Sequence, residues 1–189
     1  MNLIIDVGNT RTKVGVFEKG QLIKKTSWKK EWTVQDAKKI TARFPISQMA
    51  LSAVADYDTG TEAYFRQHYY YLKLTAQTPL PFKNLYKSPK TLGKDRLAGI
   101  AGACQLHPGK ACLVIDAGTC ITYDIIDKEG AYHGGNISPG IRMRFQAMHQ
   151  FTDRLPLVKP RKDSPWIGYN TRTALRSGGA VGAVMEMEG

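Results

Sequence analysis

Alternating and continuous apolar runs divide the first part of the chain into short elements. The segments Leu3–Val7, Thr12–Phe17 and Gln21–Thr26 alternate or run apolar, and glycine-containing turns separate them. This pattern predicts three antiparallel strands that follow one another in a sheet. The pattern becomes helical over Thr33–Phe44, which opens with a threonine and an aspartate three residues later and ends before Pro45.

The middle of the chain is also predicted to contain both strands and helices. Gln48–Val54 is apolar enough for a buried strand, while Thr61–Tyr69 predicts a helix and Tyr71–Leu74 a short strand. Thr78–Leu92 contains three prolines and is interpreted as an ordered loop. Asp95–Leu106 predicts a helix of small side chains that can pack closely on a sheet or on another helix. These elements indicate an α/β protein.

The first hairpin pattern returns 110 residues later. A shift without a gap superposes Ile5 on Ile115, Asp6 on Asp116, Gly8 on Gly118 and Gly20 on Gly130. Two copies with the same order and the same loop lengths predict two domains of one type, not a solenoid. We place the boundary near Pro108–Lys110, with domains over residues 1–109 and 110–189. In the second copy, Ser138 before Pro139 predicts the start of a helix.

Composition and cysteine usage narrow the class of protein. A chain of 189 residues with 42% hydrophobic residues can build one large or two small cores. Asp6 and Arg11 interrupt the N-terminal apolar run, and no run approaches the roughly 20 apolar residues that span a bilayer. The three cysteines lie eight residues apart without a C-x-x-C pair, so neither a zinc site nor a disulfide framework is indicated. We therefore predict a reduced, cytoplasmic protein without a membrane partner.

The net charge of +11 raises the question of an anionic partner. Lysines and arginines are spread along the chain instead of forming one tail. Nucleic acid would suit such a charge, but no RNA- or DNA-binding motif occurs, and aromatic residues do not alternate with the basic ones as a stacking surface requires. Solubility and the attraction of small anionic ligands account for the charge better.

The Asp-x-Gly turn itself suggests phosphate chemistry. Asp6 ends a strand, Gly8 lets a ligand approach the backbone closely, and Lys13 adds a positive charge. Exposed backbone N–H groups in such a turn can hold phosphate oxygens. A carboxylate repels phosphate, so its role would be to hold a hydrated Mg²⁺ that bridges to it. The alternative is that Asp6 only begins a tight turn, and the second copy at Asp116 weighs against that.

Four blocks of residues carry a family resemblance. DVGNTRTK at Asp6–Lys13 and DAGT at Asp116–Thr119 resemble the paired phosphate hairpins of the superfamily of actin, hexokinase and the heat-shock chaperone ATPases. NLYKSPKTLGKDR at Asn84–Arg96 resembles the Tyr…Gly-x-Asp-Arg block of type III pantothenate kinases. GGNISPGIRMR and GYNT at Gly168–Thr171 follow in the order and spacing of that family. No G-x-x-x-x-G-K-[ST] motif occurs, which disfavours a P-loop kinase.

The resemblance implies a fold and an activity. It implies duplicated actin/ribonuclease H-like domains, each a mixed β-sheet flanked by helices, with an ATP cleft between them. The implied reaction is the ATP-dependent phosphorylation of the 4′-hydroxyl of pantothenate, the first step of coenzyme A biosynthesis, by a cytoplasmic homodimer. Family members usually run some tens of residues longer, and that further segment supplies a late strand and a Gly-Gly turn near the adenosine.

The resemblance also assigns residues. It implies an ATP phosphate loop with Mg²⁺, formed by Asp6, Val7, Gly8, Asn9, Thr10, Arg11, Thr12 and Lys13, with Thr119 from the second hairpin. It implies a pantothenate pocket lined by Tyr86, Gly93, Lys94, Asp95, Arg96 and Thr171. Asp95 would be the proton acceptor, and Asp116 would ligate a monovalent cation, K⁺ or NH₄⁺.

Elementary chemistry agrees with two of these roles. Asp95 opens a helix, whose dipole keeps a carboxylate ionised, and a positioned base serves phosphoryl transfer. Arg96 could pair bidentately with the carboxylate of pantothenate. The alternative for this pair is a helix cap beside a surface arginine.

A second function stays open beside the enzyme. It is a catalytically silent relative that acts as a basic regulatory or nucleic-acid-associated protein. The presence of all five chemically distinctive residues favours the enzyme, since a regulator has no chemical need for them: Asp6, Asp95, Arg96, Asp116 and Thr119.

Overall fold

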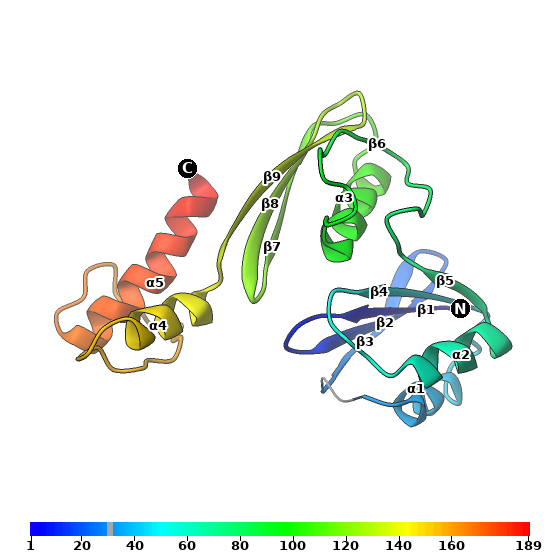
Figure 1. Cartoon of the computed structure of the whole chain (residues 1–189), viewed down its shortest axis with the longest axis horizontal. Coiled ribbons are helices and arrows are strands. Elements are labelled where there is room, and N and C mark those ends of the chain that lie inside the picture. The colour runs from blue at the N-terminus through cyan, green and yellow to red at the C-terminus, as the bar shows by residue number, and fades with distance from the viewer. Residues whose placement is uncertain (30–31) are drawn as a thin grey trace.

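Two β-sheets with helices packed on them make up the computed structural model, which describes residues 1–29 and 32–189 (Figure 1). The first sheet has the strand order β3-β2-β1-β4-β5, and the second has the order β6-β9-β8-β7. Both contain parallel and antiparallel pairs, so the prediction of mixed sheets flanked by helices is confirmed. Within the described ranges, no helix is long and apolar enough to cross a membrane.

The first sheet begins with the predicted antiparallel strands. They are β1 (Asn2–Val7), β2 (Thr12–Glu18) and β3 (Gln21–Trp28). The strands β4 (Gln48–Ala53) and β5 (Tyr70–Lys73) then extend the sheet beyond β1 in parallel. As a result β1 is a central strand, bonded to β2 on one side and to β4 on the other.

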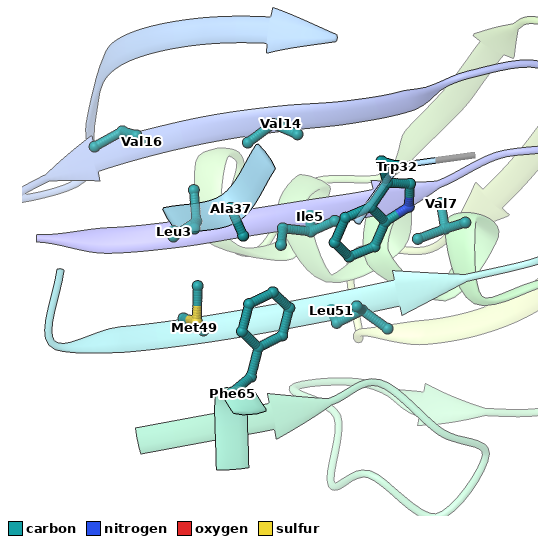
Figure 2. Close-up of a cluster of buried hydrophobic side chains, with 10 residues drawn as sticks. All are labelled: Leu3, Ile5, Val7, Val14, Val16, Trp32, Ala37, Met49, Leu51 and Phe65. Atoms are coloured by element: carbon teal, nitrogen blue, oxygen red, sulfur yellow. The ribbon is translucent and has the colours of Figure 1, made fainter. Parts of the chain in front are cut away.

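Helices α1 (Val34–Thr41) and α2 (Thr59–His68) cover one face of this sheet. α1 begins as predicted, because the backbone N–H of Thr33 donates to the carboxylate of Asp36 at 3.1 Å. Strand residues alternate between the two faces, so one face collects the apolar side chains of three strands, and Phe65 of α2 packs among them (Figure 2). The core they form consists of Leu3, Ile5, Val7, Val14, Val16, Trp32, Ala37, Met49, Leu51 and Phe65.

One strand of the second sheet lies in the segment Thr78–Leu92, which was predicted to be a loop. The members of this sheet are β6 (Lys83–Asn84), β7 (Cys112–Ala117), β8 (Cys120–Ile126) and β9 (Ala131–Pro139). β6 precedes residue 109 yet pairs in parallel with β9. The two sheets are therefore not divided at the chain position where the repeat begins.

Helix α3 (Lys94–Leu106) covers one face of the second sheet and also contacts β4 of the first. Its Leu97 and Ile100 pack with Ile126 and Tyr132 in a buried cluster. The helix therefore joins the two sheets and brings its first turn near the ends of β1 and β7.

The helices that follow β9 lie on the other side of the second sheet from α3 (Figure 1). α4 (Ile141–Gln150) and α5 (Thr171–Glu188) pack on each other, and Ala183 is buried with Ile121 and Tyr123 of β8. The prediction of a helix starting at Ser138 was wrong, because β9 continues to Pro139 and α4 starts at Ile141. Ser138 pairs with Ile121 in the sheet, and that pairing outweighs the local capping signal.

The two copies of the hairpin do not have equal loops, which corrects the prediction made from the repeat. Val7 pairs with Thr12 across residues 8–11, whereas Ala117 pairs with Ile121 across residues 118–120. The second loop is thus one residue shorter, and the gap-free shift does not hold beyond the turn. What repeats is the strand, the aspartate and the glycine after it.

Candidate phosphate and substrate site

The two Asp-x-Gly turns face each other. Asp6 and Asp116 are each the last residue but one of their strands, in different sheets. The ammonium group of Lys13 lies 3.9 Å from Oδ2 of Asp6 and 4.0 Å from Oδ1 of Asp116. Next to them, the hydroxyl oxygens of Thr10 and Thr119 are 3.0 Å apart. The structure therefore brings together residues that the sequence holds more than 100 positions apart.

Asp6 is held in an unusual electrostatic environment. Its side chain is about one-third exposed, at 31%, and within the described residues its buried Oδ1 has no hydrogen-bond partner. Burial raises the pKa of Asp6, Lys13 opposes this rise, and the charges of Asp95 and Asp116 add to it. Three carboxylates and one ammonium group thus share this region, which leaves an excess of negative charge for a cation to neutralise.

The donor set around Asp6 fits a hydrated Mg²⁺. Oδ1 of Asp6 and the hydroxyl of Ser52, its neighbour on β4, are both buried and close enough for Ser52 to lower the pKa of Asp6, and neither has another hydrogen-bond partner in the described residues. In residues 1–29 and 32–189 no three side chains of His, Cys, Asp or Glu are grouped to hold a metal. Mg²⁺ keeps several waters and needs only one or two carboxylates. Asp6 could therefore hold this ion together with phosphate oxygens.

The residues of the predicted phosphate loop divide into a buried and an exposed set. Val7 and Thr12 are both fully buried and close the hairpin from within. The N–H of Gly8 donates to the carbonyl of Arg11 at 3.2 Å and tightens the loop. The residues that stay exposed and can face a ligand are Asn9, Thr10, Arg11 and Lys13.

Asp95 lies in the first turn of α3, as predicted. Its Oδ1 accepts a hydrogen bond from the backbone N–H of Arg96 at 2.9 Å. A Cβ atom at Gly93 would lie 2.4 Å from that oxygen, so the absence of a side chain lets the carboxylate fold back over the helix start. The amine of Lys94 donates to the carbonyl of Leu92 at 2.9 Å. These contacts orient Asp95 and leave its second oxygen for another group.

Arg96 has a partner that sequence reasoning missed. Its Nε and Nη2 donate to the carboxylate of Asp124, at 2.6 Å for the shortest contact. Arg96 is 6% exposed and Asp124 1%, so the alternative of a surface arginine is wrong. Burial lowers the pKa of Arg96, but the bond to Asp124 outweighs burial and raises it. The signal in the sequence was an aspartate in the otherwise apolar run from Ile121 to Ile126.

Tyr86 lies beside this ion pair. The Arg96 guanidinium lies over the Tyr86 ring, 5.5 Å from its centre, and Tyr86 stacks on Tyr132 at 6.1 Å. Gly134 has a positive φ of 103°, and a Cβ there would lie 2.9 Å from Cδ2 of Tyr86. Tyr86, Gly93, Lys94, Asp95 and Arg96 are thus brought together at the start of α3.

Thr171 is the predicted pocket residue that lies elsewhere. It begins α5, beside a cavity of about 560 Å³ that Tyr169 and Asn170 also line. α5 packs on the sheet face that carries Ile121 and Tyr123, and α3 packs on the opposite face (Figure 1). Within one chain, the structure does not bring Thr171 to Asp95.

Together, the mixed sheets and the two facing turns define an α/β protein with a site suited to phosphate groups. The family model described as type III pantothenate kinase matches residues 2–189. A protein of that name from Phocaeicola vulgatus is 44% identical over 190 residues, which cover all of this chain and 78% of the relative. The relative of the same name from Christiangramia forsetii is 43% identical over the same shares. The chain belongs to the type III pantothenate kinase family.

A solved structure supports the fold separately. It comes from Campylobacter jejuni and is named for the Baf family of transcriptional activators. The TM-score is 0.58 at 22% identity, over 98% of this chain and 77% of that one. At this identity the likeness concerns the arrangement of helices and strands.

Proposed function

We propose that this protein transfers the γ-phosphoryl group of ATP to the 4′-hydroxyl of pantothenate, which makes 4′-phosphopantothenate, the first step of coenzyme A biosynthesis. The observation that carries the proposal is the convergence of Asp6, Lys13 and Asp116, with Asp95 close enough to act on the pKa of Asp6. Phosphoryl transfer needs mainly positioning and charge stabilisation, and such a cluster supplies both.

The facing turns would hold the phosphates of ATP. The exposed backbone of residues 9–11 offers N–H groups to phosphate oxygens, and Lys13 offers a positive charge. Asp6 would hold Mg²⁺, which when bound neutralises charge on the phosphates. Asp116, whose side chain is 54% exposed, would bind K⁺ or NH₄⁺, and Thr119 would contact ATP beside it.

Asp95 would act as the base. The amide of Arg96 occupies Oδ1, and the carboxylate lies at the positive end of the α3 dipole. Oδ2 accepts the proton of the 4′-hydroxyl while that oxygen bonds to the γ-phosphorus. The bond from phosphorus to the β,γ-bridging oxygen breaks, and ADP leaves with that electron pair. Tyr86, Lys94 and Arg96 would orient pantothenate for this attack.

We also infer two related domains of the actin/ribonuclease H type with ATP between them. The predicted division into residues 1–109 and 110–189 separates the two hairpins, while β6 and α3, which precede it in the chain, pack with the second sheet. The antiparallel strands β1-β2-β3 and β7-β8-β9, each starting with a strand that ends in Asp-x-Gly, support this inference. A homodimer is supported by the large exposed side chains of Trp166, Ile167 and Tyr169 near Thr171. The cytoplasmic location stays a prediction from the resemblance.

The proposal is tested by following ADP release from the purified chain with ATP, Mg²⁺ and K⁺, with and without pantothenate. We expect release that depends on pantothenate, and a product that mass spectrometry shows to be pantothenate with one added phosphoryl group. ADP release that is the same without pantothenate would contradict the proposal.

A further inference from the structure

We propose that Asp124 is a positioning residue, which holds Arg96 in the orientation that recognises the carboxylate of the substrate. The inference rests on the proposed function, in which Arg96 binds the carboxylate of the substrate. Asp124 itself does not reach the substrate: it is 1% exposed, in the middle of β8, between Val114 of β7 and Gly135 of β9.

Both oxygens of Asp124 are used to hold the guanidinium. Oδ1 accepts from Nη2 of Arg96 at 2.6 Å and from Nε at 3.0 Å, and Oδ2 accepts from Nε at 3.1 Å. The hydroxyl of Tyr132, also fully buried, donates to Oδ1 at 2.7 Å. Three donors therefore determine the position of one carboxylate, and that carboxylate determines the plane of the arginine.

The same contacts leave one edge of Arg96 for a ligand. Nη1 makes no hydrogen bond to Asp124, and the neighbour of the guanidinium besides that carboxylate is Tyr86. Because Nε and Nη2 form the edge that faces Asp124, Nη1 lies on the side of the guanidinium away from that carboxylate. Because the guanidinium is planar and donates along fixed directions, holding Nε and Nη2 on Asp124 also sets the direction of the Nη1 donors.

Packing of the core does not by itself explain why this ion pair is buried. Two buried charges lose hydration, and apolar side chains of similar volume often stabilise a core equally well or better. The neighbours of Asp124 are largely apolar, with Ile121, Ile125 and Ile126 on the same strand. The pair has a clear use, however, if one edge of the arginine must be held rigidly toward an anion.

Tyr86 depends on the same group of residues. Its ring contacts both the guanidinium of Arg96 and the ring of Tyr132, and each of these two groups donates to Asp124. Two predicted pocket residues, Arg96 and Tyr86, are thus held by residues of β8 and β9. Asp124 is the group that joins them.

The test compares two substrates in one preparation. Pantothenol keeps the 4′-hydroxyl but has an alcohol in place of the carboxylate. The ratio of kcat/KM for pantothenate to kcat/KM for pantothenol does not depend on how much of the enzyme is folded. We expect wild type to favour pantothenate, and Asp124→Asn to lower the ratio roughly ten- to a hundredfold, the effect that loss of an orienting partner has on metal ligands.

Two further variants make the comparison decisive. Asp127→Asn is the matched control, because Asp127 is a carboxylate of the same hairpin that pairs with His133 near the surface; its ratio should equal that of wild type. Tyr132→Phe keeps the ion pair and removes one donor, so it should lower the ratio by a smaller factor. If Asp124→Asn does not fold, Tyr132→Phe still tests the inference.

The outcomes separate the inference from the proposed function. A wild-type ratio in both Asp124→Asn and Tyr132→Phe, even with reduced melting temperatures, would show a purely structural role and overturn the inference. Equal use of the two substrates by wild type would overturn it too, while leaving the kinase activity intact. A wild type that phosphorylates neither compound would overturn the proposed function itself.

Discussion

Lys13 on β2 reaches Asp116 on β7, with its ammonium group 4.0 Å from Oδ1, while it lies 3.9 Å from Asp6 on its own sheet. One side chain thus stands between two carboxylates that would otherwise repel each other across the two sheets. The side chains of Lys13 and Asp116 are 60% and 54% exposed, so this contact contributes little to stability. Its value lies in the charge that it places between the turns.

Replacing Lys13 should therefore affect ATP more than folding. For Lys13→Met we expect the KM for ATP to rise roughly ten- to a hundredfold, because a charged hydrogen bond to phosphate is worth about 1.5–3 kcal/mol. The free energy of unfolding in urea should change by less than about 1 kcal/mol. Lys39→Met, at an exposed lysine that pairs with Asp36 at 3.2 Å, is the control. An unchanged KM for ATP in Lys13→Met would remove Lys13 from the phosphate site.

Asp95→Asn separates the base from the helix start. The amide oxygen of asparagine can still accept the N–H of Arg96, so the melting temperature should stay close to that of wild type. Because the base is lost, we expect kcat to fall roughly 10²–10⁴-fold with little change in the KM for pantothenate. Turnover at the wild-type rate, combined with a lower melting temperature, would assign Asp95 to helix capping alone.

Arg96→Ala should affect both binding and stability. The carboxylate of pantothenate carries the same charge before and during transfer, so loss of its partner should raise KM more than it lowers kcat. Asp124 would be left buried without its cation, which typically costs about 3–5 kcal/mol. We expect the double variant Arg96→Met with Asp124→Leu to regain stability in urea but not affinity for pantothenate. Recovery of both would show that Arg96 does not contact the substrate.

The proposed monovalent cation site predicts a salt dependence. We expect activity that requires K⁺ or NH₄⁺ and is lost in Asp116→Asn, because removal of the charge weakens an oxygen site for a weakly held ion. The measurement is turnover in chloride salts of K⁺, NH₄⁺ and Na⁺ at equal ionic strength. Full activity in Na⁺ alone, unchanged in Asp116→Asn, would contradict this role.

The loss of stability in acid should include a contribution from Glu62. Its carboxylate accepts hydrogen bonds from Lys73 at 2.8 Å, Tyr57 at 2.5 Å and Arg66 at 2.7 Å. Burial raises its pKa, but these donors outweigh burial and lower the pKa from 4.5 to about 2. A lowered pKa stabilises the fold fully above the unfolded value of 4.5, and the contribution is lost as the pH falls through about 2.

The matching experiment compares wild type with Glu62→Gln in urea between pH 7 and pH 2. The side chain is 13% exposed, so the pKa shift sets an upper limit of about 3 kcal/mol on its charge-dependent contribution. We expect the difference in free energy of unfolding to be constant above about pH 5 and to shrink below it. Glu129→Gln, at an exposed glutamate, is the control substitution. A difference independent of pH would contradict the lowered pKa.

Local patterns by themselves determined most of the elements and the positions of the reactive residues. The alternation in Leu3–Val7 and Thr12–Phe17 predicted an antiparallel pair, and the capping residues Thr33 and Asp36 predicted the start of α1. Asp95 was predicted at the opening of α3. These features depend on neighbours within a few positions, where backbone geometry and hydrogen-bonding side chains act directly.

Only the tertiary structure decided which groups meet and which face is covered. Arg96 finds Asp124 because α3 packs on the side of β8 that carries this aspartate, and Thr171 is separated from Asp95 because α5 packs on the other side. Leu3 is fully buried in a central strand, whereas Leu113 at the matching position of β7, an edge strand, is 55% exposed. Burial, and with it the pKa of a side chain, depends on what packs over a residue, and that partner is distant in sequence.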